Sequence, residues 1–575
     1  MATSSLSSIS GVTTGIDTTA LINAIVAQKA TGMNRLQAKK DLNDKKTTAL
    51  NAMRTALTTL SLSMATLQDK LNSRAVTSTD SNNTNVIATA SGVASGNYDI
   101  SVKTVATKGR LSATVDPVTG LTTNLAVANP GDSALSPIFT SGTSATFAVQ
   151  GTDGVVKEIT LDASSNTLNG LRDRINASGA GVVASVVNMG KGPNPYQLVL
   201  SAKDTGTGKT GGVVTLAALS GTVAPGLGIP AGSYGTPLAD GTQTIIGGVT
   251  SATSGANAVD ANFTVNGIAL TRTTNIVKDA VDGMTFTLKQ GGQTGTTTLT
   301  VGPDKAGATA AAQDFITKYN QLMKDYQAAS TSTRNADGSI NEAPLASDST
   351  TRTMMANLKA TLFGQTSGLP SGSAYKALPN IGISSQADGT VYLNVITFQT
   401  AVGNDLAAVQ RLFSFAGDST SPAVTFRAGG TKTVTGAVDF AVTRDPGTGA
   451  LSGTLTRNGV TSDPILVVDG VLTGTGDFAG LSLAVTDAAT GTITLSRGVG
   501  QAMKDIISSF TSVSSGGGLK AILDSIQAQN KSLGAQIQTA QTRLNQEKEN
   551  LKKKFAQMES VVAQMRGSAG SLASV

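Results

Sequence analysis

A tetrapeptide in the middle of the chain, Thr207-Gly208-Lys209-Thr210, has residue types that could bind phosphate. It resembles the end of a P-loop, in which backbone N–H groups and a lysine hold the phosphates of a nucleotide. The P-loop motif also needs a glycine about five residues before Gly208. That position is Lys203, and the Gly-Gly-Val-Val that follows the tetrapeptide does not predict a helix. We therefore interpret the tetrapeptide as a β-turn.

Carboxylates, serines and lysines are the other groups that could do chemistry. Asp337, Glu342 and Asp348 could bind calcium, but their spacing does not fit an EF-hand loop, so we interpret them as part of a solvated loop. Ser–Lys pairs occur without the nucleophile-elbow or class A β-lactamase patterns. The chain contains no Cys and no His, which removes thiolates, zinc–cysteine sites and the commonest general base. We predict that the protein is not an enzyme and that it holds no cofactor and no metal.

The charge and hydropathy of the chain restrict its partners. The net charge of +6 is a mild excess over 575 residues. The basic cluster of Lys548 with Lys552, Lys553 and Lys554 has no interleaved aromatic residues, so we interpret it as a solvated helix face and expect no nucleic acid partner. No stretch approaches the roughly 18 apolar residues of a membrane span, so we expect no membrane insertion.

The first residues bear on export. Met1–Ser10 are rich in Ser and Thr and lack a basic n-region and an apolar h-region, so we expect no cleavable signal peptide. A chain without Cys suits a protein that leaves the cell or passes through a narrow exporter unfolded. If the protein is exported, we expect a route that reads another signal.

Helical seams at the two ends of the chain are the elements that must position any functional surface. Apolar residues recur there at helical spacing, which puts them on one side of a helix. We name the two sets the N-terminal seam and the C-terminal seam and predict that they form an assembly interface. The N-terminal seam comprises Leu50, Met53, Leu57, Leu60, Met64, Leu67 and Leu71, and the C-terminal seam comprises Leu544, Leu551, Phe555, Met558, Val562 and Met565. The simplest partner of each seam is the other end of the same chain, and other copies of the chain are the next.

Between the seams the chain is rich in predicted strands. Its 64 glycines and only 4% aromatic residues favour many short strands with tight turns. Asn-Gly at 266–267, between the alternating runs of 263–270, is typical of a hairpin with a type I′ turn. Helices are predicted at 166–177, at 308–330, at 350–362 and at 402–413, and Asp17 is a predicted N-cap of the first helix. Gly516–Gly518 predict a break before the last helix, which we expect to run from about Leu519 to Met565.

Six segments of the chain carry a resemblance to a known family: Gly15–Ile22, Asn166–Leu200, Phe263–Leu288, Phe315–Leu322, Ile381–Gly389 and Lys554–Glu559. In the same order along the chain, they resemble the bacterial flagellar filament cap protein family, which is FliD, the second hook-associated protein family. Residues 166–200 among them also resemble the motif shared by flagellins and hook-associated proteins. Residues 420–497 look longer than the usual connection of the family, which predicts an extra β-rich insertion.

The resemblance implies an α+β multidomain fold. Its terminal helices are expected to form an antiparallel coiled-coil stalk, joined to a mixed helical leg domain and to inserted β-rich head domains. The expected boundaries are 1–75, a disordered start and a coiled-coil helix that pairs with 500–575; 76–110 with 301–419 as the leg domain; 111–300 as a head region of two subdomains; and 420–497 as the extra insertion.

The resemblance also implies a function. It predicts an extracellular cap at the distal tip of the filament, which retains exported flagellin and promotes its folding and polymerisation. The implied partners are other copies in a ring-shaped homo-oligomer, flagellin, and an export chaperone in the cytoplasm. Two alternatives remain: another axial flagellar protein, such as a junction protein or flagellin, and a surface adhesin that binds mucin or glycans.

Overall fold

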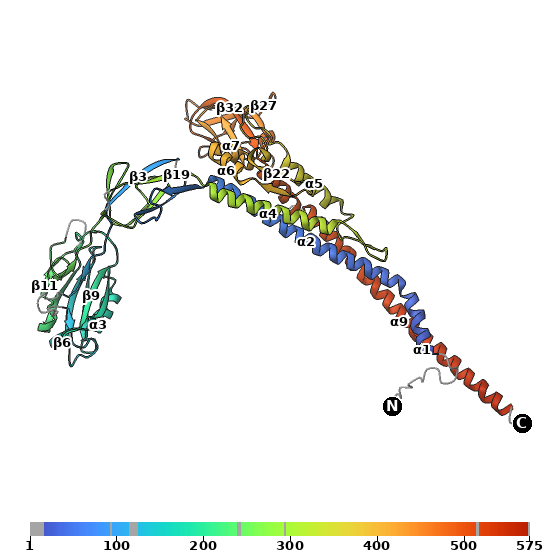
Figure 1. Cartoon of the computed structure of the whole chain (residues 1–575), viewed down its shortest axis with the longest axis horizontal. Coiled ribbons are helices and arrows are strands. Elements are labelled where there is room, and N and C mark those ends of the chain that lie inside the picture. Colours follow the sequence, from blue (N-terminus) through green and yellow to red (C-terminus); the bar gives the residue numbers. More distant parts are fainter. Residues whose placement is uncertain are drawn as a thin grey trace. The chain divides into compact units, whose positions relative to one another are not determined.

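The computed structural model describes residues 17–92, 95–113, 125–237, 243–292, 295–512 and 517–572 (Figure 1). The chain forms two compact units, each of which folds around its own cores. The terminal unit comprises Met1–Leu71 and Lys305–Val575, and the central unit comprises Asn72–Asp304. The predicted disorder before residue 16 lies outside the described residues, as does Gly516 of the predicted glycine break.

Long helices dominate the terminal unit. They are α1 (Thr18–Lys29), α2 (Thr31–Asn72), α4 (Lys305–Ser330), α5 (Ser349–Phe363), α6 (Val395–Asn404), α7 (Leu406–Phe413), α8 (Val499–Thr511) and α9 (Gly518–Leu572). The predicted cap of α1 is confirmed, since Asp17 Oδ1 accepts a hydrogen bond of 2.8 Å from the N–H of Ala20. Short antiparallel pairs connect the helices: β20 (Thr333–Arg334) with β21 (Ile340–Asn341), and β22 (Ile383–Ser385) with β23 (Val391–Leu393).

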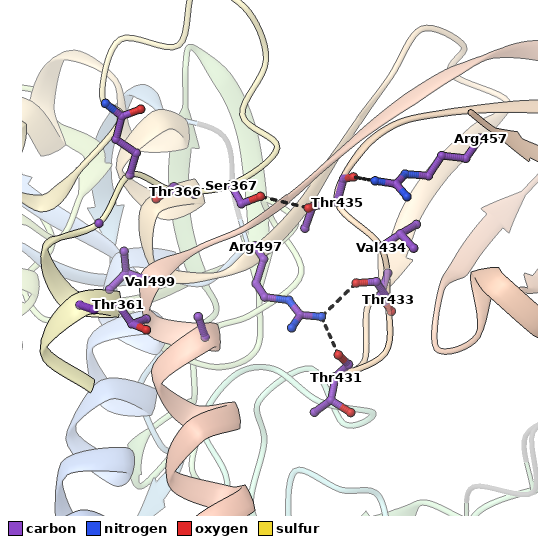
Figure 2. Close-up of a pocket in the computed structure, with 14 residues that line it drawn as sticks. Thr361, Thr366, Ser367, Thr431, Thr433, Val434, Thr435, Arg457, Arg497 and Val499 are labelled. Atoms are coloured by element: carbon purple, nitrogen blue, oxygen red, sulfur yellow. Dashed lines mark hydrogen bonds between the residues drawn. The ribbon is translucent and has the colours of Figure 1, made fainter. Parts of the chain in front are cut away.

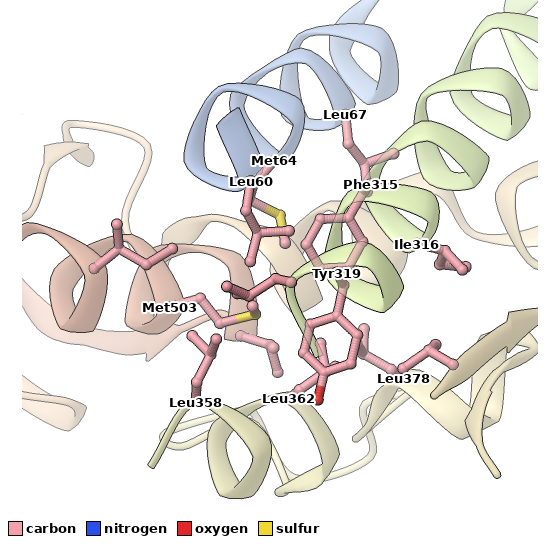
Figure 3. Packing of buried hydrophobic residues seen from close by; sticks show 14 of the residues in the cluster. Leu60, Met64, Leu67, Phe315, Ile316, Tyr319, Leu358, Leu362, Leu378 and Met503 are labelled. Carbon is pink, nitrogen blue, oxygen red and sulfur yellow. The ribbon is translucent and has the colours of Figure 1, made fainter. Parts of the chain in front are cut away.

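The helices enclose one apolar core, part of which is shown in Figure 3. Leu60 and Met64 of α2 lie in it beside Phe315 and Tyr319 of α4, and Met503 of α8 belongs to the same cluster. Spacings of three and four residues put these side chains on one face of each helix, and burying that face stabilises the bundle.

The predicted single helix over 402–413 is two helices in the structure. α6 ends at Asn404 and α7 begins at Leu406. Asp405 lies between them, and its Oδ1 accepts a hydrogen bond of 2.8 Å from the N–H of Ala408. The carboxylate therefore caps a new helix, which explains why the first one does not continue.

Residues 415–497 form a β-rich insert within the terminal unit, with two sheets around its own apolar core. The larger sheet contains β24 (Phe415–Ser419), β32 (Ala489–Arg497), β26 (Gly436–Arg444), β27 (Leu451–Arg457), β28 (Val460–Thr461) and β29 (Ile465–Leu466). The smaller sheet contains β25 (Val424–Ala428), β31 (Ser482–Val485) and β30 (Val471–Thr473). The first and last strands of the insert, β24 and β32, pair with each other, so the chain enters and leaves it at adjacent points.

The central unit contains two apolar cores. One is built from residues 111–249 and the other from residues 86–106 and 261–301. The first has α3 (Leu168–Ser178), β4 (Arg110–Leu111), β5 (Ala126–Val127), β6 (Phe139–Gln150), β7 (Val156–Asp162), β8 (Val182–Asn188), β9 (Tyr196–Ala202), β10 (Thr215–Val223), β11 (Gly232–Tyr234), β12 (Ile245–Gly247), β13 (Val249–Thr250) and β14 (Gly255–Ala256). The second has β1 (Arg74–Ser78), β2 (Val86–Ala90), β3 (Gly96–Thr104), β15 (Ala261–Val265), β16 (Ile268–Arg272), β17 (Ile276–Val277), β18 (Met284–Leu288) and β19 (Thr297–Pro303).

Two local predictions for the central unit are confirmed. The helix predicted over 166–177 is α3, with Leu168, Leu171 and Ile175 buried. The Asn-Gly hairpin joins β15 to β16, and its two turn residues, Asn266 and Gly267, have φ of 48° and 81°. Positive φ at both positions is the requirement of a type I′ turn.

The expected leg domain needs a correction, because 76–110 lies in the central unit, whereas the chain from Lys305 onward lies in the terminal unit. β1 and β3 both pair with β19, and β2 pairs with β18. Alternating burial along β3, where Ile100 and Val102 point inward, gives it one apolar face. β19 and β15 flank β3 in one sheet, and the apolar side chains of the β17-β18-β2 sheet belong to the same core, so residues 76–104 complete the second core of the central unit.

Candidate assembly surface on the terminal helices

The N-terminal seam lies inside the helical core of the terminal unit. All seven of its side chains are buried, from Leu50 at 0% exposed to Met53 at 5%. Their neighbours in the core come from α4, α5 and α8. Because the chain itself covers these side chains, any part that they take in assembly is indirect, through the helix that they hold in place.

The C-terminal seam is much less covered. Leu544, Leu551, Phe555 and Val562 are partly buried. Met558 is 38% exposed, and Met565 is 66% exposed. Earlier in the same helix, Leu519 and Ile526 are buried in the helical core. The apolar side chains of α9 therefore pass from core to surface along the helix.

Polar side chains join α9 to α1 and α2 in an antiparallel register. Lys29 Nζ lies 2.6 Å from Glu547 Oε1. Asn530 Nδ2 donates to Asp44 Oδ1 at 2.7 Å, and the amides of Asn43 and Gln529 lie 3.4 Å apart. Asn43 and Asp44 of α2 contact α9 at 529–530, whereas Lys29 of α1 contacts it further along, at Glu547, so the two ends of the chain run side by side in opposite directions.

A groove of about 800 Å³ separates the helices where α1 ends and α2 begins. Met33 and Leu36 line one side, and small side chains such as Ala535 and Ala540 of α9 line the other. Closer to the start of α1, Ile22 is buried and lines a smaller cavity together with residues of α9. The two ends thus pack closely at some points and leave apolar surface open at others.

Several of the charges on α9 form exposed ion pairs. The hydrogen bond from Lys29, and then its positive charge, hold the pKa of Glu547 below its usual value. Lys552 acts in the same way on the pKa of Glu549, three residues earlier on the same helix. Exposed pairs of this kind contribute little free energy and weaken with salt, so they favour an orientation more than they stabilise it.

The tetrapeptide Thr207–Thr210, which resembles the end of a P-loop, lies in a turn of the central unit. Asp260 accepts hydrogen bonds from the N–H and the Oγ1 of Thr207, at 2.6 and 2.8 Å. The N–H of Lys209 donates to the carbonyl oxygen of Thr152. Hydrogen bonds within the chain occupy these groups of the tetrapeptide, which agrees with the interpretation as a turn.

The three carboxylates considered for calcium have separate positions. Asp337 accepts from the N–H and the Oγ of Ser339 in a turn. Asp348 caps α5 through the N–H of Thr351, and Glu342 is exposed. Over the ranges that the structure describes, no three acidic side chains come together in a group that could hold a metal ion. In the same ranges, we find no helix with both the length and the apolarity that crossing a membrane requires.

Sequence reasoning did not identify the polar partners of α9. Lys29 and Glu547 are 518 residues apart, and neither stands in a motif. Asn43 and Gln529 are uncharged polar residues, and no charge pattern in the sequence marks them as partners. Only the antiparallel pairing of the two ends, which the seams suggested, could have directed attention to these residues.

Comparison with known proteins gives three family matches. The model described as flagellar hook-associated protein 2 C-terminus matches residues 258–567, and the model of the N-terminus matches 14–109. A flagellin hook IN motif matches residues 146–204, where the sequence resembles that motif. Flagellar hook-associated protein 2 of Escherichia coli K12 is 30% identical over 419 residues, which cover 71% of this chain and 80% of that protein. The B-type protein of Pseudomonas aeruginosa PAO1 is 27% identical, with coverages of 71% and 81%.

Solved structures of the same family are also similar to this chain. The D1-D2-D3 domains of the flagellar cap protein FliD from E. coli align at 26% identity and a TM-score of 0.45, over 64% of this chain and 90% of that one. FliD of P. aeruginosa PAO1 aligns at 24% identity and a TM-score of 0.31, over 44% and 100%. Because the C-terminal family model alone matches more than half of the 575 residues, the chain belongs to the flagellar hook-associated protein 2 family.

Proposed function

We propose that this chain is the subunit of the cap at the distal end of the bacterial flagellar filament, where it retains exported flagellin and promotes its folding and polymerisation. The observation that carries the proposal is the match of the hook-associated protein 2 models to residues 14–109 and 258–567. This membership favours a cap over the other axial proteins, flagellin and the junction proteins. The role is structural and needs no covalent chemistry.

In this proposal the terminal helices act as an antiparallel coiled-coil stalk. The contacts of Lys29 with Glu547 and of Asp44 with Asn530 support it, since they fix the direction and register of the two ends. The buried N-terminal seam supports it as well, because it anchors α2 in the helical core from which the stalk extends.

The assembly contact is then made by the C-terminal seam, at Met558 and Met565. Both side chains are exposed in the single chain, and their spacing of seven residues places them on the same side of α9. Exposed apolar side chains that gather on one face of a helix favour a protein partner. The partner in this proposal is the open end of the filament, and identical copies complete a closed ring.

The cap works outside the cell and reaches the tip unfolded, with the help of a cytoplasmic chaperone. The absence of Cys supports this route, because no disulfide has to form after export. The β-rich parts of the chain then provide the plate beneath which flagellin folds.

Deletion of the gene in its motile host tests the proposal. We expect abundant monomeric flagellin in the culture medium and few or short filaments, because exported subunits are no longer retained. Re-expression of the chain should restore filaments and reduce the leaked flagellin. Normal filaments without leakage in the deletion strain would contradict the cap function.

A further inference from the structure

A cleft of about 670 Å³ lies in the terminal unit, where the β-rich insert meets the helices (Figure 2). Its walls come from the end of α5 and the loop after it, from the 431–435 loop and β27 of the insert, and from the first turn of α8. Hydroxyl groups of Thr361, Thr366, Ser367, Thr433 and Thr435 belong to the lining. None of the lining residues belongs to either seam, so the stalk proposal does not use them.

The cleft carries positive charge and has no acidic lining residue. Arg457 Nη2 donates to the carbonyl oxygen of Thr435 at 2.9 Å, and Arg457 has no ion pair within the described parts of the chain. Arg497 is balanced by Asp505 of α8, whose Oδ2 lies 3.3 Å from Arg497 Nη1. One guanidinium therefore faces the cleft with its charge uncompensated.

Two buried polar atoms at the cleft have no hydrogen-bond partner among the residues that the structure describes. Thr366 is only 8% exposed, and its Oγ1 is unpaired. Arg497 Nε is buried and unpaired too, although Nη2 of the same side chain donates to the carbonyl oxygens of Thr431 and Thr433, as Figure 2 shows. A buried donor without an acceptor is unfavourable, so an acceptor at this position would stabilise the site.

The N-terminus of α8 is a third feature that favours an anion in the cleft. This helix of 13 residues starts after Gly498, which has no side chain to cap it, and no acidic residue occurs in its first turn. Val499 and Ala502, both in that first turn, line the cleft. Free N–H groups at a helix N-terminus carry partial positive charge and attract anions.

We propose that this cleft binds a small oxyanion, a phosphate or a carboxylate. An oxyanion accepts hydrogen bonds from Arg457, from the hydroxyl of Thr366 and from Arg497 Nε, and it compensates the unbalanced guanidinium. A cation would meet two guanidinium groups and a helix N-terminus, and an apolar ligand would leave the buried donors unpaired. Phosphate and carboxylate share the chemistry that these groups recognise.

The test measures anion binding to the full chain in chloride buffer at constant ionic strength. Inorganic phosphate is titrated by calorimetry and by the broadening of its ³¹P resonance, and acetate is titrated in parallel by calorimetry. We expect saturable binding of at least one of them. The R457Q substitution should weaken it by about tenfold or more, since it removes a charged donor.

Two further variants make the test specific. T366V removes the buried hydroxyl at nearly constant volume and should weaken binding by about threefold to tenfold. Without phosphate or acetate, T366V should leave the melting temperature unchanged or raise it, because its hydroxyl has no partner to lose. R444Q, at the opposite end of β26 from the 431–435 loop, removes an equal charge from an exposed ion pair and should bind like the original chain.

Binding of phosphate without acetate, or the reverse, would identify which oxyanion fits the cleft. The proposal is overturned if neither anion binds saturably, which would mean that the cleft holds only water. It is equally overturned if R457Q and T366V bind as tightly as R444Q.

Discussion

Single polar side chains decide where helices of this protein begin. Asp17, Thr167, Asp348, Asn394 and Asp405 each accept a hydrogen bond from a backbone N–H three residues later. A helix start leaves its first N–H groups without partners, and a short side-chain oxygen supplies one acceptor. Asp405 has the largest effect, because it divides one apolar stretch into α6 and α7.

The cap of α1 gives a prediction at the scale of one residue. Asp17→Ala should destabilise the start of α1 by about 1 kcal/mol, because the N–H of Ala20 loses its acceptor. Hydrogen exchange of the first amides of α1 should therefore speed up by about fivefold. Asp17→Asn keeps an oxygen at the same place and serves as the matched control. Equal exchange in the Ala and Asn variants would show that the side chain does not cap this helix.

Asp162 in the central unit gives a pH dependence. Hydrogen bonds from the Oγ of Ser164, and then from Ser165, lower the pKa of this carboxyl from 3.8 to about 2. Between pH 3.8 and about pH 2, the carboxyl binds a proton more readily in the unfolded chain than in the folded one. The stability that Asp162 contributes is therefore complete above pH 3.8 and is lost as the pH falls toward 2.

Thermal unfolding of the central unit measured over this acidic range is the check. We expect Asp162→Asn to remove part of the pH dependence of the melting temperature. Ser164→Ala should act in the same direction, because it removes the hydrogen bond that contributes most to the low pKa. An unchanged pH profile in both variants would mean that the hydrogen bonds of Asp162 do not persist in solution.

At the scale of elements, α2 and α9 use similar apolar spacing for different purposes. The N-terminal seam of α2 is enclosed by the chain, whereas the last apolar residues of α9 remain exposed. The same heptad pattern thus builds a core in one helix and leaves a surface in the other. Burial, and not the pattern, separates the two roles.

The Leu57→Asp/Leu60→Asp variant tests this difference. Both side chains are fully buried, so the charges should unfold the helices of the terminal unit, at a cost of more than about 5 kcal/mol. The central unit has its own cores and should stay folded. Hydrogen exchange resolved by peptide is the measurement, with Met565→Asp as the exposed control. Protection of α2 and α4 equal to that of the control would contradict the placement of this seam in the core.

The sequence predicted local elements better than their partners. The Asn266-Gly267 turn, α3 and the cap of α1 follow from neighbouring residues, which carry the signal for each. The pairing of β1 with β19 joins segments more than two hundred residues apart, and nothing in either strand specifies the other. For the same reason, Lys29 and Glu547 could not be connected, and the enclosure of Leu57 in the helical core could not be foreseen from its spacing alone.

In the whole molecule, we propose that the exposed end of α9 makes the assembly contact. Met558→Asp should leave the fold intact, because the side chain is 38% exposed. It should still raise the leaked flagellin in a complemented deletion strain, because a charge on the seam disfavours an apolar contact. Ser560→Asp puts the same charge on an exposed position outside the seam and should complement normally. If both variants complement normally, the C-terminal seam is not part of the assembly contact.

The central claim is that this chain caps the distal end of the filament. The most direct test is immunogold electron microscopy of intact flagella with an antibody against the chain, scored for the position of each gold particle. We expect label at the distal tip of the filament and none along its length. Label along the whole filament, or at the junction between hook and filament, would contradict it.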